Sequence, residues 1–174
     1  MHSQGLASTV VARSVVGRLE TEKPPGRPVE RRRPTRGSTK LQANRGSIRH
    51  HVVLDRPADE VWALVGEPAR IPEWFPGIVS CEVNGNERTV VTAGGLPIPE
   101  RILTLDPLQR RFQYQIEAPI CRFHLGTLDV VELGDRRCLV VYATDAEPST
   151  VALTIGGGAA AALRHLGGLF EGDR

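Results

Sequence analysis

In the second part of the chain, the hydrophobic positions follow first a strand pattern and then a helix pattern. Residues 48–54 (IRHHVVL) are rich in β-branched and apolar types, which predicts a strand that ends near Asp55. Pro57 favours the first position of a helix, and a second short helix is predicted over 68–74 before Pro76-Gly77 turns the chain. The apolar residues of the first helix recur three or four positions apart, at Ala58, Val61, Trp62 and Val65. We therefore expect this stripe to pack in the core.

Six further strands are predicted from short apolar runs that are separated by turn residues. Asn84-Gly85 is a strong signal for a hairpin, and Asp106-Pro107 and Gly134-Asp135 mark two more turns. The runs cover residues 78–83, 88–93, 99–105, 111–117, 123–133 and 138–145. Because strands that are joined by short turns pair antiparallel, the sequence predicts six antiparallel strands after the two short helices.

A closing helix is predicted after Pro148, where the apolar spacing changes from two residues to three or four. The residues that mark it are Val151, Ile155, Ala159, Ala162, Leu166 and Leu169. The pattern indicates a helix of about 20 residues. Gly156-Gly157-Gly158 falls inside this segment and is expected to weaken or bend it. The same small residues would let the helix lie close to the sheet.

Charge divides the chain into two parts of different composition. Residues 1–47 carry ten Arg and Lys against three Glu, a net charge of +7, whereas 48–174 carry twelve Arg against seventeen acidic residues, a net charge of −5. Residues 20–47 are also rich in Pro, Gly, Arg and Ser, so they cannot bury enough surface to offset the entropy of ordering. We therefore expect a disordered basic tail over 1–47 and one folded domain over 48–174.

The basic tail allows several interpretations. Its Arg31-Arg32-Arg33 run could contact nucleic acid or anionic lipid, and its Arg-rich, acid-poor composition is also typical of an organelle presequence. A solvated tail, or translation from a misplaced start site, is the plainer account. Nucleic-acid binding is therefore not the favoured function.

Composition excludes several other classes of protein. Hydrophobic residues at 40% and charged residues at 24% do not fit a fibrous or wholly disordered chain. The three cysteines, Cys81, Cys121 and Cys138, form no C-x-x-C pair, so we expect reduced thiols rather than a disulfide framework. No run approaches the roughly 18 apolar residues of a membrane span, and the apolar patch over 6–12 lacks the charged region of a secretory signal. We expect a cytoplasmic protein.

Several segments together resemble a known superfamily. The PADEVW run at 57–62 and the IPEWFPGI run at 71–78 are similar to the opening of START-like proteins, and more narrowly of the polyketide cyclase/dehydrase and lipid-transport group, the SRPBCC proteins. Glu100-Arg101-Ile102, Asp106-Pro107, Arg110-Arg111-Phe112 with Tyr114, and Gly134 with Val140-Val141-Tyr142 resemble its later strands. The resemblance spans about residues 48–172. It implies an α+β helix-grip fold, in which a seven-stranded antiparallel sheet wraps around a long C-terminal helix and encloses a cavity for an apolar molecule.

Candidate ligand-binding residues follow from strand phase. Phe112, Tyr114 and Ile116 share one face of their strand and are expected to point toward the cavity, where the Tyr114 hydroxyl needs a partner. Trp74, between two prolines in a predicted loop, could line the mouth of the cavity. Arg101 could neutralise an acidic group of a ligand, although an outward ion pair with Glu100 or Glu117 is the plainer alternative.

His124 is in phase with Gly126, Leu128 and Val130, which makes it the nearest candidate for a general base; a hydrogen-bonded core histidine is the alternative. His124, Tyr114 and Arg101 are weak catalytic candidates at most, because no nucleophile or phosphate-binding motif is present. We predict no cofactor. We also predict no metal site, because His50 and His51 point to opposite faces of a strand.

Three functions remain open at this point. The favoured one is binding or carriage of an apolar small molecule, such as a lipid or a polyketide-like compound. The second is a cyclase or dehydrase that acts on a ligand in the same cavity. The third is a regulatory or partner-binding protein that uses its basic tail.

Overall fold

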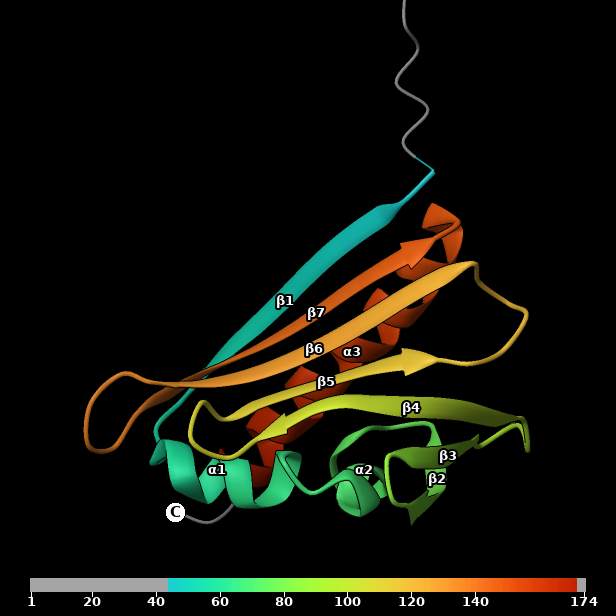
Figure 1. Ribbon diagram of the computed structural model, residues 1–174. Coiled ribbons are helices and arrows are strands. Elements are labelled where there is room, and N and C mark those ends of the chain that lie inside the picture. The colour runs from blue at the N-terminus through green and yellow to red at the C-terminus, as the bar shows by residue number, and fades with distance from the viewer. Residues whose placement is uncertain (1–43, 172–174) are drawn as a thin grey trace, which may run out of the picture. The chain divides into compact units, whose positions relative to one another are not determined.

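The computed structural model describes residues 44–171, and seven strands in this range form one antiparallel sheet (Figure 1). Their order across the sheet is β1-β7-β6-β5-β4-β3-β2. The strands are β1 (Gly46–Leu54), β2 (Ile78–Asn84), β3 (Glu87–Thr92), β4 (Pro97–Asp106), β5 (Arg111–Ile116), β6 (Phe123–Glu132) and β7 (Cys138–Glu147). Each strand from β2 to β7 pairs with its neighbour in sequence, and β1 closes the order by pairing with β7. This confirms the predicted seven-stranded antiparallel sheet.

The helices occupy two places in the chain. After β1 come α1 (Ala58–Val65), the short 3-10 helix η1 (Pro68–Arg70) and α2 (Ile71–Trp74), and after β7 comes α3 (Ser149–Glu171). Figure 1 shows α3 crossing behind the sheet, while α1 and α2 lie along the lower edge of the view. The result is the helix-grip arrangement of an α+β domain.

The core lies between the inner face of the sheet and α3. Alternate residues of β6 and β7 point inward, as the two-residue period of a strand requires, and α3 packs small and apolar side chains against them. Among the most buried side chains are Leu128, Val130, Val140, Ala162 and Leu166. Trp62 is partly buried and packs against this core, in line with the prediction for the first helical stripe.

The triple glycine does not interrupt the closing helix, because α3 is continuous from Ser149 to Glu171. The predicted interruption at Gly156-Gly157-Gly158 is therefore wrong, whereas a weakening or bending of the helix by these glycines stays a prediction. The predicted close approach is correct, since a Cβ atom at Gly156 would lie 2.9 Å from Cγ2 of Ile48 on β1. The packing of α3 against the sheet offsets the low helix propensity of these glycines.

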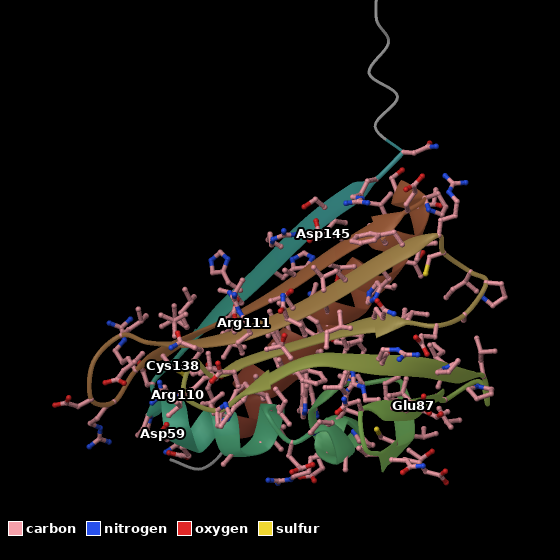
Figure 2. All side chains as sticks on the ribbon, viewed as in Figure 1. Asp59, Glu87, Arg110, Arg111, Cys138 and Asp145 are labelled. Carbon is pink, nitrogen blue, oxygen red and sulfur yellow. The ribbon has the colours of Figure 1, made fainter. Side chains whose placement is uncertain are left out.

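An ion pair links α1 to the hairpin between β4 and β5. Arg110 has a positive φ of 47° in this turn, and its Nε donates to Oδ1 of Asp59 at 2.7 Å. Figure 2 shows both side chains at this corner of the domain. Asp59 lies in the first turn of α1, where its negative charge complements the positive end of the helix dipole. It thus stabilises the helix start and also has a tertiary partner in Arg110.

The boundaries of the domain differ slightly from the predicted ones. Strand β1 begins at Gly46, two residues before the predicted start at Ile48, so Gly46 and Ser47 belong to the sheet rather than to the tail. Residues 1–43, which make up most of the predicted tail, lie outside the described residues. All three cysteines are described and are free thiols. No helix within residues 44–171 is long and apolar enough to span a membrane.

Candidate ligand-binding cavity

A partly open cavity of about 210 Å³ lies between the sheet, the end of α2 and the N-terminal half of α3. Its walls are mainly apolar and include Phe75, Ile78, Val90, Ile98, Ile116 and Ile155. Three buried side chains supply its main polar groups, Glu100 from β4, Tyr114 from β5 and Tyr142 from β7. An apolar wall with a few polar groups is the usual composition of a small-molecule site.

A buried ion pair stands at the β3–β4 side of the cavity. Arg88 and Glu100 are direct partners across the two strands, and Arg88 Nε donates to Glu100 Oε2 at 2.7 Å. Their side chains are only 2% and 6% exposed. Burial raises the pKa of the Glu100 carboxyl, although the adjacent guanidinium opposes this shift. The carboxyl group lines the cavity, so any ligand there meets a carboxyl group that is already paired.

The guanidinium of Arg88 packs against two aromatic rings. Its Cζ is 4.8 Å from the centre of the Phe112 ring and 4.6 Å from that of Tyr114. Such cation–π contacts help to hold a buried guanidinium in a fixed position. Arg88 is not among the residues that line the cavity.

Two tyrosines share a hydrogen bond at the base of the cavity. The hydroxyl groups of Tyr114 and Tyr142 are 2.7 Å apart, and both side chains are almost fully buried. Burial raises the pKa of Tyr114 well above its usual value and that of Tyr142 to about 12, so both are neutral at neutral pH. Only one of the two hydroxyl hydrogens is used in the bond between them. The pair therefore keeps one proton that it can donate to another acceptor.

The structure brings some of the predicted site residues together. Tyr114 and Ile116 line the cavity, as their strand phase predicts. Phe112 points the same way but is buried in the core, where its ring stacks on Tyr114 with centroids 5.6 Å apart.

His124 lies beside the tyrosine pair, with its ring centroid 5.3 Å from that of Tyr114, but does not line the cavity. Its Nδ1 accepts a hydrogen bond from the backbone N–H of Ile116 at 3.1 Å, so the neutral ring carries its proton on Nε2. Nε2 is buried and has no hydrogen-bond partner among the described residues. Burial lowers the pKa of His124 to about 4. Such a ring is a weak base, which favours the core-histidine alternative.

Trp74 and Arg101 are placed differently from the expected cavity positions. Trp74 belongs to α2 rather than to a loop, is 3% exposed and packs against Phe75 and Tyr142. Trp74 is not among the residues that line the cavity, whereas its neighbour Phe75 is. Arg101 is about half exposed and its Nε pairs with Glu117 at 2.5 Å, which is one of the two outward ion pairs considered above.

Arg88 and Tyr142 were not among the predicted site residues, and Glu100 was predicted only as an outward partner of Arg101. A signal for the buried pair was present in the strand phase. Arg88 is in phase with Val90, and Glu100 is in phase with Ile98 and Ile102, so each charge sits on the apolar face of its strand. The strand phase thus makes Arg88 and Glu100 candidates for a buried pair, and the register between β3 and β4 decides that they meet.

Comparisons with known proteins agree with this architecture. The profile of the "Polyketide cyclase / dehydrase and lipid transport" family matches residues 45–171. No curated protein matches the chain in sequence. Within residues 44–171, no three His, Cys, Asp or Glu side chains form a cluster that could hold a metal ion.

Solved structures share the fold at low identity. An uncharacterized protein from Bacillus thuringiensis is 23% identical with a TM-score of 0.67, over 72% of this chain and 98% of the other. A START superfamily protein from Mycobacterium smegmatis is 14% identical with a TM-score of 0.63, over 74% and 99% of the two chains. The di-domain ARO/CYC BexL of the BE-7585A biosynthetic pathway is 22% identical with a TM-score of 0.61, over 70% of this chain and 45% of BexL. The chain belongs to the polyketide cyclase/dehydrase and lipid-transport family and has its START-like helix-grip fold.

Proposed function

We propose that residues 44–171 bind a compact, largely apolar molecule in the cavity between the sheet and α3. The observation that supports this most directly is the cavity itself, in which apolar walls surround the paired Glu100 carboxyl and the tyrosine hydroxyls. Apolar walls bind by the area they remove from water, and the few polar groups fix the orientation of the ligand. The family to which the chain belongs is named for proteins that handle polyketides and lipids.

The size of the cavity limits the ligand. A volume of about 210 Å³ is below the ~300–1,000 Å³ that is usual for drug-sized ligands, whereas a cavity of ~150 Å³ suffices for benzene. A one- or two-ring molecule therefore fits better than a long acyl chain. Lipid transport in the literal sense would require the cavity to open further.

A binding experiment with matched variants tests this proposal. The purified full-length protein is analysed by native mass spectrometry, and any small molecule that co-purifies with it is extracted and identified. A panel of one- and two-ring compounds and fatty acids is then screened by thermal unfolding. We expect ring compounds to raise the unfolding temperature, and we expect this rise to vanish in Ile155→Trp, because Ile155 lines the cavity and the larger side chain would fill it.

The control is Leu153→Trp on the same helix. Leu153 is 65% exposed and lies outside the cavity lining, so the same large side chain there should leave binding unchanged. Equal ligand stabilisation of the wild type and Ile155→Trp would show that the compounds bind elsewhere. No adduct and no stabilisation by any compound would contradict the proposal.

A second candidate function is catalysis on the bound molecule, such as a cyclisation or dehydration of a polyketide-like compound. The observation in its favour is Glu100, whose carboxyl lines the cavity and whose pKa is raised by burial toward the range that suits proton transfer. In a dehydration, Glu100 would take a proton from the carbon next to a carbonyl and deliver it to the departing hydroxyl group, which leaves as water. His124 does not line the cavity, so it has no direct role in this proton transfer.

Mass spectrometry distinguishes catalysis from passive binding. A β-hydroxyketone that binds the protein is incubated with wild type and with Glu100→Gln, and the loss of one water is monitored over time. Turnover in the wild type that falls by about two orders of magnitude or more in Glu100→Gln would support catalysis, provided that the variant still binds the compound. Recovery of the unchanged compound would rule out this dehydration and leave binding as the function.

A further inference from the structure

From the orientation of the Arg88–Glu100 pair we infer that the cavity selects a neutral ligand that donates a hydrogen bond to Glu100, such as a phenol or another alcohol, and rejects carboxylates. This inference rests on the proposed binding function and names the chemical class of the ligand. The preferred ligand class depends on which member of the Arg88–Glu100 pair lines the cavity.

The carboxyl group is the member that a ligand contacts. Glu100 lines the cavity, whereas Arg88 lies over the rings of Phe112 and Tyr114 and is 3% exposed. A buried arginine near a pocket would by itself indicate a site for an anion. Here the cavity is lined by the carboxyl group and not by that arginine, so a ligand carboxylate would face a group of like charge. The geometry thus reverses the specificity that the arginine alone would indicate.

Glu100 has free capacity to accept a hydrogen bond. The bond from Arg88 Nε uses Oε2, and a carboxylate has two oxygens with about four lone-pair positions. The guanidinium cannot lose its proton and favours the ionised carboxylate, which is an acceptor only. A hydroxyl hydrogen on the ligand would therefore find an acceptor that is fixed in place by its existing partner.

Charge balance favours a neutral donor over a cationic one. The pair already has zero net charge, and it is buried where the cost of an extra unpaired charge is high. An ammonium group would introduce such a charge, whereas a hydroxyl group would not. The spare proton of the Tyr114–Tyr142 pair can in turn be donated to the oxygen of the same hydroxyl or to a second oxygen of the ligand. The cavity thus offers one acceptor and one donor to a hydroxylated molecule.

Four probes with the same ethyl-substituted ring test this inference in the full-length protein. They are para-ethylphenol, para-ethylfluorobenzene, para-ethylbenzoate and para-ethylbenzylammonium, and their Kd values are measured at neutral pH by titration followed by NMR. Fluorobenzene resembles phenol in shape but has no hydrogen to donate. A hydrogen bond to a charged group predicts that the phenol binds roughly tenfold to a hundredfold more tightly than the fluoro compound. The two charged probes should both bind more weakly than the phenol.

Two double variants assign the preference to the buried pair. Arg88→Met with Glu100→Leu replaces both charges by apolar groups of similar size, a change that buried pairs often tolerate, and it should lose most of the preference for the phenol over the fluoro compound. The control is Arg101→Met with Glu117→Leu, which removes the same two charges from a more exposed pair; Arg101 follows Glu100 directly on β4. This variant should keep the preference for the phenol.

Each contrary result has a distinct meaning. Equal binding of phenol and fluoro compound by the wild type, or an undiminished preference in the Arg88→Met/Glu100→Leu variant, would overturn the inference and leave the proposed binding function standing. Tightest binding of the benzoate or of the ammonium probe would overturn it as well. Failure of every probe to bind would contradict the proposed function and the inference together.

Discussion

The ring of Tyr114 on β5 covers Gly126, its direct partner on β6, so closely that any side chain at position 126 would overlap with it. This contact allows the Tyr114 hydroxyl to reach Tyr142 on β7, because the ring passes over the intervening strand. Position 126 thus requires glycine because the Tyr114 ring occupies the space of a side chain, and not because the backbone of β6 needs an unusual conformation there.

The substitution Gly126→Ala is expected to displace the Tyr114 ring and to break its hydrogen bond with Tyr142. Overpacking of a well-packed core costs roughly 1–3 kcal/mol, which should appear as a lower midpoint of urea unfolding together with weaker ligand binding. Gly94→Ala is the control, because a Cβ there would meet no atom closer than 3.8 Å. An unchanged unfolding midpoint for Gly126→Ala would mean that Tyr114 moves aside without cost.

Adjacent glycines of α3 should respond in opposite directions to the same substitution. Gly156→Ala would place its Cβ 2.9 Å from Ile48 and should destabilise the domain, whereas Gly157 is exposed and a Cβ there would meet no atom within 4 Å. Gly157→Ala should therefore stabilise the protein by about 0.5–1 kcal/mol through helix propensity. Urea unfolding of both variants checks this prediction, and shifts of the same sign would contradict the close approach of α3 to β1.

Burial of His124 should make the stability of the domain depend on pH. Its pKa is about 4 in the folded protein against 6.5 for a free imidazole, so the unfolded chain binds a proton that the folded one does not. Stability should be complete above pH 6.5 and should fall as the pH decreases toward 4, by up to about 3 kcal/mol.

The measurement is urea unfolding across this pH range for the wild type and for His124→Asn, which keeps an acceptor for the Ile116 N–H. The raised pKa of Glu100 acts in the opposite direction, because protonation of that carboxyl is easier in the folded protein. The difference between the two proteins isolates the histidine. Identical pH profiles would show that His124 is solvated or protonated in the folded state.

The two members of the buried ion pair should differ in how much their removal costs. Glu100→Leu leaves Arg88 buried with a charge that it cannot lose, and it should destabilise the domain by about 3–5 kcal/mol. Arg88→Met leaves a carboxyl group that can take up a proton, because burial already raises its pKa, so the loss should be smaller. The Arg88→Met/Glu100→Leu double variant should be close to the wild type. Urea unfolding at neutral pH compares the three, and equal losses for both single variants would contradict this asymmetry.

The order of the elements and the inward face of each strand could be predicted from the sequence. Turn residues such as Asn84-Gly85 separate the strands, and the two-residue period turns Tyr114 and Ile116 toward the core. The three- to four-residue period after Pro148 similarly predicts α3. These signals are local, since each depends only on residues that are close together in the chain.

Tertiary structure alone decided which inward side chains meet. The Arg88–Glu100 pair depends on the register between β3 and β4, and the sheet contains register shifts between Ile78 and Ser80 and between Ile102 and Thr104. A shift of one residue moves a side chain to the other face, so partners across a sheet do not follow from the period of one strand. The Tyr114–Tyr142 bond even joins strands that are not neighbours. The sequence thus determined the sheet and its apolar face, whereas the polar chemistry of the cavity arises only when distant strands and α3 are packed together.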